Sequence, residues 1–193
     1  MESMIDELAH AANADPLAYR MKLLSDKPRF AKVLSVAAEK AGWGTPPPAG
    51  RARGIAVHES FGSIIAEVAE VSIENGHIRV HKVTAGVDCG TQVNPQGLEA
   101  QIQGSIAFGL TAALFGKLTL DAGRVEQTNF HDYPILRIHE MPAIEVHVVE
   151  SGAKMGGIGE PATAPIAPAV ANAVFALTGK RLRTLPFDLG AAT

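Results

Sequence analysis

Gly156-Gly157-Ile158-Gly159-Glu160-Pro161 is the stretch around which this chain is organised, and the apolar run from Ile166 to Leu177 follows it. Three glycines in four positions allow left-handed or crowded backbone conformations and the close approach of another group. In the run that follows, apolar residues recur every three or four positions, which predicts a helix that buries one face. Because Pro165 and Pro168 carry no amide hydrogen, we expect the regular helix to begin near Ile166.

Glu160 is the carboxylate of this stretch, and its residue type leaves two interpretations open. It could complement the dipole at the N-terminus of the following helix, an effect worth less than about 1 kcal/mol. It could instead be a general base, held against a cofactor or substrate in a glycine-lined pocket. Spacing alone does not choose between these interpretations.

Composition limits the function classes that the chain can belong to. Its 193 residues are 47% hydrophobic and 19% charged, which indicates a folded globular body with a sizeable core. The net charge of −3 comes without a basic run, so we expect no nucleic-acid partner. We find no apolar stretch long enough to span a membrane and no signal peptide, and we expect a soluble protein. The single cysteine, Cys89, excludes an internal disulfide and any iron-sulfur cluster ligated by this chain alone.

Residues 1–50 predict a helical lead-in that ends in a linker. Helical spacing of apolar residues runs from Met4 to Ala12, from Asp15-Pro16 to Leu24, and from about Arg29 to Ala41. The proline-rich segment Thr45 to Gly50 predicts a stiff linker and a boundary. Since these helices show no catalytic constellation, we interpret them as scaffold. Residues 51–193 would then form the functional unit.

From Arg53 onward the period of the pattern changes to two, which predicts a sheet. The expected strands cover residues 54–60, 64–73, 78–87 and 143–149, with short strands at 118–120 and 125–128. Asn75-Gly76 between the second and third strands is a strong hairpin signal, because both residues tolerate positive φ. The histidines of this part show no metal-ligand spacing, so we expect no metal ion bound by protein side chains. The predicted fold class is α+β: N-terminal helices, then a mixed or antiparallel sheet with packed helices.

A helix from about Gly97 to Phe115 is expected to follow the third strand. Gly104 and Gly109 interrupt it at a cost of about 1 kcal/mol each relative to alanine, which requires a reason. Either a neighbouring backbone packs closely there, or a bulky ligand lies against the helix. The amides of Gln101 and Gln103 could bind such a ligand, although solvent exposure is the ordinary state of a helical glutamine. The predicted buried face is Ile102, Ile106, Leu110 and Leu114.

Several stretches together resemble one known family, the molybdenum-binding large subunit of the xanthine oxidase family. Its isoquinoline 1-oxidoreductase and aldehyde dehydrogenase branch, of bacterial molybdenum hydroxylases, is the most similar. The resemblance covers nearly the whole chain, and the Gly-x-Gly-Glu-Pro motif at 157–161 is its most specific part. The other stretches are Asp88-Cys89-Gly90 with Asn94-Pro95, Gln101-Ile102-Gln103-Gly104, Asn129 to Tyr133, and Glu140-Met141-Pro142.

The resemblance implies a role for individual residues. In that family the glutamate of the motif faces the molybdenum and is the general base in the oxidation of an aldehyde or N-heterocycle, which makes Glu160 the catalytic residue here. A glutamine at the position of Gln101 binds the molybdopterin, and the space at Gly104 admits the pterin. Gly157 and Gly159 would line the same site. The implied cofactor is molybdopterin, with its cytosine dinucleotide form included, and iron-sulfur clusters lie on a partner chain.

The chain departs from the family pattern in length, because the large subunit is several times longer. The resemblance therefore implies a heteromer with the remaining half of the molybdenum-binding subunit, an iron-sulfur small subunit and a small-molecule substrate. An alternative is a catalytically silent structural or assembly module, or a fragment of such a subunit. The bacterial cytoplasm and the periplasm both stay open as compartments.

Overall fold

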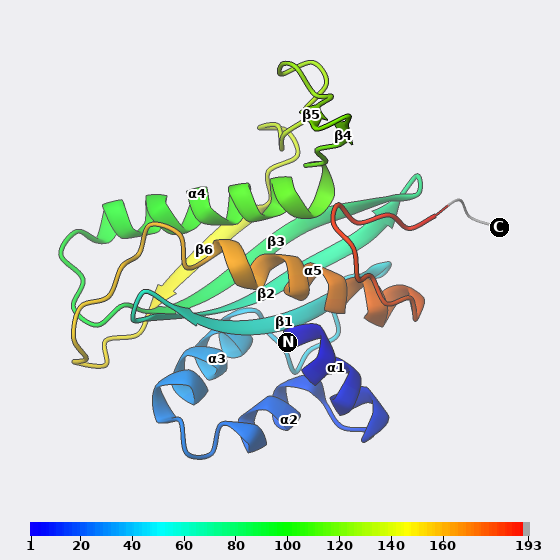
Figure 1. Ribbon diagram of the computed structural model, residues 1–193. Coiled ribbons are helices and arrows are strands. Elements are labelled where there is room, and N and C mark those ends of the chain that lie inside the picture. Colours follow the sequence, from blue (N-terminus) through cyan, green and yellow to red (C-terminus); the bar gives the residue numbers. More distant parts are fainter. Residues whose placement is uncertain (191–193) are drawn as a thin grey trace.

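The computed structural model describes residues 1–190 of the chain (Figure 1). Helices and a sheet alternate along the sequence, which agrees with the predicted α+β class. The helices are α1 (Glu2–Ala11), α2 (Pro16–Leu23), α3 (Pro28–Lys40), α4 (Pro95–Leu114) and α5 (Thr163–Thr178). The strands are β1 (Arg51–Ser60), β2 (Ser63–Glu74), β3 (His77–Asp88), β4 (Leu120–Asp121), β5 (Arg124–Val125) and β6 (Ala143–Val148).

The main sheet has the strand order β1-β2-β3-β6, and it is mixed (Figure 1). β1, β2 and β3 are antiparallel neighbours, whereas β6 pairs in parallel with β3. Helices α4 and α5 cover one face, where the larger apolar cluster lies, and α3 covers the other face. Alternate residues of one strand supply both clusters: Ile65 points to α4 and α5, and Ile64 points to α3.

The hairpin between β2 and β3 confirms the prediction made from Asn75-Gly76. Asn75 has φ 52° and Gly76 has φ 78°, so both central residues adopt the left-handed conformation that such a turn needs. The predicted cross-strand neighbours are also present, because Val71 pairs with Val80 and Ile73 with Ile78. This register places apolar side chains of both strands against the larger cluster.

The expected start of α5 near Ile166 is wrong, because the helix begins at Thr163. Pro165 lies in the first turn, where an amide hydrogen would have no partner within the helix in any case. Pro168 lies inside the helix and removes only one backbone hydrogen bond. The buried face of α5 compensates for that loss, since six consecutive residues from Ala169 to Val174 are buried.

The N-terminal helices are joined to the body by ion pairs and hydrogen bonds. Arg20 of α2 is buried, and its Nε lies 2.9 Å from Oε2 of Glu2. The same Glu2 oxygen accepts a hydrogen bond from the Val57 amide of β1, at 3.0 Å. Asp6 of α1 pairs with Arg181 at 2.7 Å, just beyond α5. The domain boundary at residue 50 stays a prediction.

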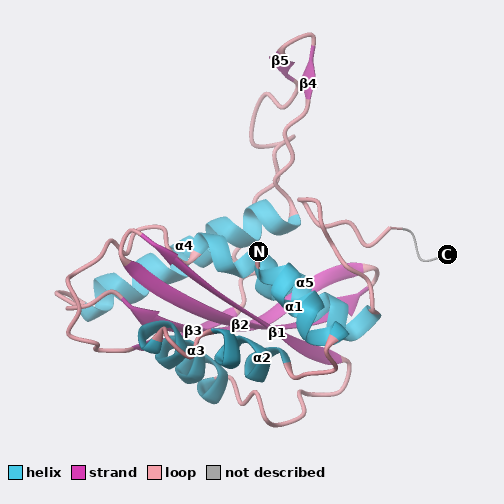
Figure 2. Cartoon of the chain, turned by 60° about the horizontal axis from the view of Figure 1, so that its bottom comes forward, coloured by secondary structure: helices cyan, strands magenta, loops and turns pink. Residues whose placement is uncertain are grey.

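Residues 116–142 form a projecting segment, here called the arm, between α4 and β6 (Figure 2). β4 and β5 pair at its far end, and each has two residues, shorter than the strands expected there. Residues 118–128 alternate in hydropathy but bury almost nothing, which explains why so little of them is regular strand. Across residues 1–190, none of the helices has the length and apolar character needed to cross a membrane.

Candidate functional site

The glycine-rich turn at 156–161 is held by hydrogen bonds from distant parts of the chain. The Gly156 amide donates to the carbonyl of Cys89 at 2.9 Å. The Gly157 amide donates to the carbonyl of Phe61 at 2.8 Å, and the Ser63 hydroxyl donates to the carbonyl of Gly157 at 2.7 Å. The turn between β1 and β2 therefore fixes the turn that carries Glu160.

The glycines of this turn serve close packing rather than left-handed geometry. None of Gly156, Gly157 and Gly159 is among the residues with positive φ in the described chain, which corrects the expectation of left-handed conformations. A Cβ on Gly156 would lie 2.6 Å from the hydroxyl of Ser63, so only glycine fits there without a shift. A Cβ on Gly159, in contrast, would meet no atom of this chain within 4 Å.

Ser105 of α4 joins two of the predicted site segments, and sequence reasoning missed it. Its buried hydroxyl lies 2.8 Å from the carbonyl of Gln101 and 2.7 Å from the carbonyl of Gly159. Since a hydroxyl has one hydrogen, the two carbonyls share it. Ser105 thereby places the turn beside α4, next to Gln101. A polar residue between Ile102 and Ile106 on a buried helical face was the sequence signal that could have identified it.

The two glycines inside α4 have different surroundings. A Cβ on Gly109 would lie 2.3 Å from Cγ2 of Ile166 and 2.7 Å from the carbonyl oxygen of Thr163, so α4 and α5 pack in close contact there. A Cβ on Gly104 would meet nothing within 4 Å. Close helix packing therefore explains Gly109, and nothing in residues 1–190 explains Gly104.

Glu160 lies exposed at the end of the turn, before α5. Its carbonyl accepts a hydrogen bond from the Thr163 amide at 2.9 Å. No side chain caps the N-terminus of α5, where Ala162 is the N-cap residue. Within the described part of the chain the Glu160 carboxylate has no hydrogen-bond partner, so the geometry gives no support to a capping role. The carboxylate is free to interact with a group outside this chain.

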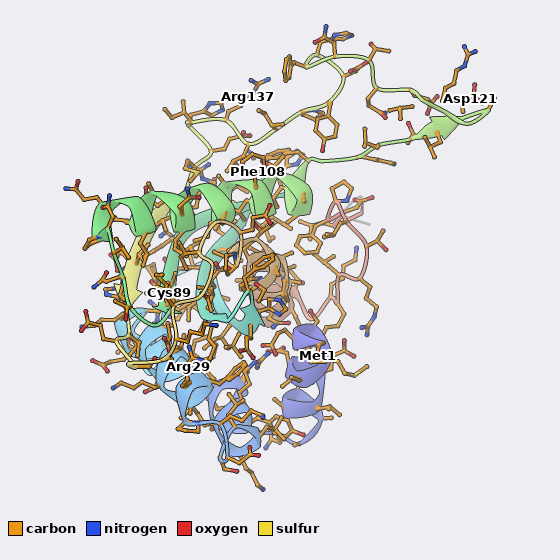
Figure 3. All side chains as sticks on the ribbon, turned by 60° about the vertical axis from the view of Figure 1, so that its left-hand side comes forward. Met1, Arg29, Cys89, Phe108, Asp121 and Arg137 are labelled. Carbon is orange, nitrogen blue, oxygen red and sulfur yellow. The ribbon has the colours of Figure 1, made fainter. Side chains whose placement is uncertain are left out.

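A second layer of contacts supports the turn from below. Asp88 is fully buried and accepts hydrogen bonds from Arg29 Nε at 2.8 Å, from the Gly90 amide at 2.9 Å and from the Ser151 hydroxyl at 2.8 Å. Burial pushes the pKa of Asp88 upward, but these donors together hold it below its ordinary value. The contacts fix the segment that carries the Cys89 carbonyl, and Figure 3 shows Cys89 and Arg29 on the same side of the molecule, below α4.

Other titratable groups do not join this site. His131 and Asp132 lie on the arm, with 3.7 Å between His131 Nε2 and Asp132 Oδ2. Glu67 of β2 is fully buried, and neither of its carboxylate oxygens has a partner. Burial raises the pKa of Glu67 well above its ordinary value, which favours the neutral acid. No group of three or more His, Cys, Asp or Glu side chains in residues 1–190 could hold a metal ion.

The predicted site residues form an open surface of α4 and the turn. Gln101, Gly104, Gly157, Gly159 and Glu160 are all exposed. The surface fits a flat polar group such as a pterin in two respects. Gly104 and Gly159 leave space that no atom of this chain fills, and the Gln101 amide offers both a donor and an acceptor. A cofactor that lay here would cover one side of itself with this chain and would need another polypeptide on the other side.

Comparison with known proteins gives one consistent family. Residues 4–142 match the molybdopterin cofactor-binding domain. The beta chain of the isoquinoline 1-oxidoreductase of Brevundimonas diminuta is 35% identical over 190 residues, which cover 96% of this chain and 24% of that protein. One of the subunits of the nicotinate dehydrogenase of Pseudomonas putida is 37% identical over 206 residues, with 96% and 17% covered.

Solved structures agree with the sequence comparison. The crystal structure of quinoline 2-oxidoreductase from Pseudomonas putida 86 superposes with a TM-score of 0.57 at 28% identity, over 64% of this chain and 17% of that one. The chain thus spans about a quarter or less of the length of these relatives. It belongs to the molybdopterin cofactor-binding domain family, as part of the molybdenum-binding subunit of xanthine-oxidase-type molybdenum hydroxylases.

Proposed function

We propose that this chain forms one wall of the active site of a molybdenum hydroxylase that oxidises an aldehyde or an N-heterocycle. The observation that carries the proposal is the open surface at Gly104 and Gly159, beside Gln101. A glycine in the middle of α4 destabilises the helix by about 1 kcal/mol relative to alanine. This chain makes no use of the space so created, and a flat cofactor would use it.

When bound, the molybdenum cofactor would supply the two-electron oxidation and the transfer of an oxygen derived from water. Substrate and water together give the hydroxylated product, two protons and two electrons. The exposed backbone at Gly104 and Gly159 would support the pterin, and the Gln101 amide would orient it by hydrogen bonds. The cytosine dinucleotide form of the cofactor, and iron-sulfur clusters on a partner chain that receive the electrons, belong to the same proposal.

Glu160 is the proposed general base. Its carboxylate makes no hydrogen bond within residues 1–190, and the turn that carries it is fixed by the contacts from Phe61, Ser63, Cys89 and Ser105. A fixed carboxylate without a partner of its own is suited to accept a proton from the attacking oxygen. The remaining part of the molybdenum-binding subunit would close the site, exclude water and provide the walls that select the substrate.

The test is carried out on the assembled enzyme. Glu160→Gln should lower kcat about 10²- to 10⁴-fold, the usual contribution of a general base, and leave the molybdenum content unchanged. Glu39→Gln, at an exposed carboxylate of α3, is the matched control and should have no effect. Gln101→Ala should instead lower the molybdopterin content, whereas Gln96→Ala on the same helix should not.

Full turnover of the Glu160→Gln enzyme would remove that residue from the role of base. A metal-free and inactive protein, purified together with all partner chains, would favour the alternative of a silent structural or assembly module.

A further inference from the structure

The arm, residues 116–142, carries large apolar side chains that nothing covers. Figures 1 and 2 show it projecting away from the sheet and helices, with β4 and β5 at its far end. Ile138 is 94% exposed, and α4 adds Phe108, 76% exposed, at the base of the arm. Exposed apolar side chains gathered in this way mark an interaction surface more often than a solvated one. The others on the arm are Leu118, Leu120, Val125, Phe130 and Ile135.

The arm is held in shape by its own polar contacts, although it buries little. Gln127 accepts a hydrogen bond from the Thr119 amide at 2.8 Å and donates one to the Thr119 hydroxyl at 2.9 Å. Asp132 accepts hydrogen bonds from the amides of Thr128 at 2.8 Å and Asn129 at 2.9 Å. These amides, Thr128 first, lower the pKa of Asp132 to about 2. A segment that is already ordered loses little conformational entropy when it binds.

The base of the arm contains a cavity that could receive an anchoring side chain. Its volume is about 290 Å³, and Phe108 of α4 lines it together with Ile135, Ile138 and Met141 of the arm. Figure 3 shows Phe108 on the side of α4 that faces Arg137 of the arm. Phe108 lies one helical turn beyond Gly104, so this apolar surface continues the proposed cofactor surface along α4.

We propose that the arm and this cavity are the docking surface for the remaining part of the molybdenum-binding subunit, which inserts an apolar side chain into the cavity. This inference rests on the proposed function. The occupant follows from two observations: the family match to residues 4–142 includes the arm, and the relatives carry the matched region within a polypeptide about four times as long. The arm would hold that part of the subunit against the cofactor surface, on the side of α4 that this chain leaves open.

Hydrogen-deuterium exchange tests the inference by comparing this chain alone with the same chain in the assembled subunit. Amides of the arm should exchange at least tenfold more slowly in the assembled subunit, because docking removes them from solvent. Ile138→Glu should bring the exchange of the arm back toward the rate in the chain alone, since a carboxylate would be buried in an apolar contact. Leu23→Glu on α2, at a leucine that is 53% exposed, is the matched control and should leave the exchange unchanged.

Equal exchange of the arm in the two states would overturn the inference. So would protection of the arm in the chain alone that rises with concentration, because a second copy would then be the occupant. Exchange needs no turnover, and it therefore separates the two proposals. If the arm is protected in an enzyme that keeps full turnover after Glu160→Gln, the docking surface stands and the assignment of the base fails.

Discussion

Alanine at position 104 should stabilise this chain while it harms the enzyme, and alanine at position 109 should do the reverse of the first effect. A methyl group at Gly104 would meet no atom of the chain within 4 Å, so Gly104→Ala should gain the full helix propensity of about 1 kcal/mol. For a chain of this size that corresponds to a rise in Tm of about 2–4 °C.

Gly109→Ala supplies the matched comparison in the same helix. Its methyl group would overlap Ile166 Cγ2 at 2.3 Å and the Thr163 carbonyl oxygen at 2.7 Å. Overpacking costs about 1–3 kcal/mol, and the Thr163 atom is backbone, which cannot rotate away. After the gain in helix propensity, we expect a net loss of about 1–2 kcal/mol.

Two measurements read these variants. Thermal unfolding of the chain alone gives the stability, and molybdenum content of the assembled enzyme gives cofactor retention. Gly104→Ala should raise Tm and lower the molybdenum content, because its methyl group stands where the pterin is proposed to lie. A Gly104→Ala enzyme with full molybdenum content would refute the idea that this space belongs to the cofactor. A fall in Tm for the same variant would show that the helix needs glycine for its own packing.

Two further predictions concern buried carboxyl groups. Glu67 has a folded-state pKa raised above its ordinary value of 4.5, so it lowers stability as pH rises above 4.5; Glu67→Gln should remove a pH dependence of up to about 1.4 kcal/mol per unit, and urea unfolding that shows equal slopes for both chains would contradict this. Asp88 has a pKa held below 3.8, so its stabilisation is present above that pH and is lost as pH falls; Asp88→Asn should destabilise the chain by about 1.5–3 kcal/mol at pH 7, with a difference that narrows below pH 4 in the same assay.

The sequence predicted the sheet well, because its signals are local. Asn75-Gly76 determines a turn whatever the rest of the chain does, and Val71 and Val80 then face the same side. The start of α5 was misplaced because Pro165 and Pro168 argue against a helix only when burial is ignored. Tertiary packing decides such cases, and it cannot be read from the residues of one segment.

The contacts that hold the site were beyond sequence reasoning for a related reason. Ser105 and Gly159 are far apart in the chain, and only the fold shows that a hydroxyl joins them. The link from Arg29 to Asp88 likewise connects a segment that we interpreted as scaffold to the support of the turn. The roles of Glu160, Gln101, Gly104, Gly157 and Gly159 come from the family resemblance and remain proposals.

The parallel pairing of β6 with β3 has a consequence for the order of folding. A parallel partner cannot be reached through a tight turn, and residues 89–142 separate these two strands. Closing so long a connection costs entropy before any contact offsets it, and such distant pairing is slow. We therefore expect the β1 to β3 meander to form early during synthesis and β6 to join late. The turn from Gly156 to Pro161 comes after β6, so a half-folded chain offers no finished surface on which a costly cofactor could be lost.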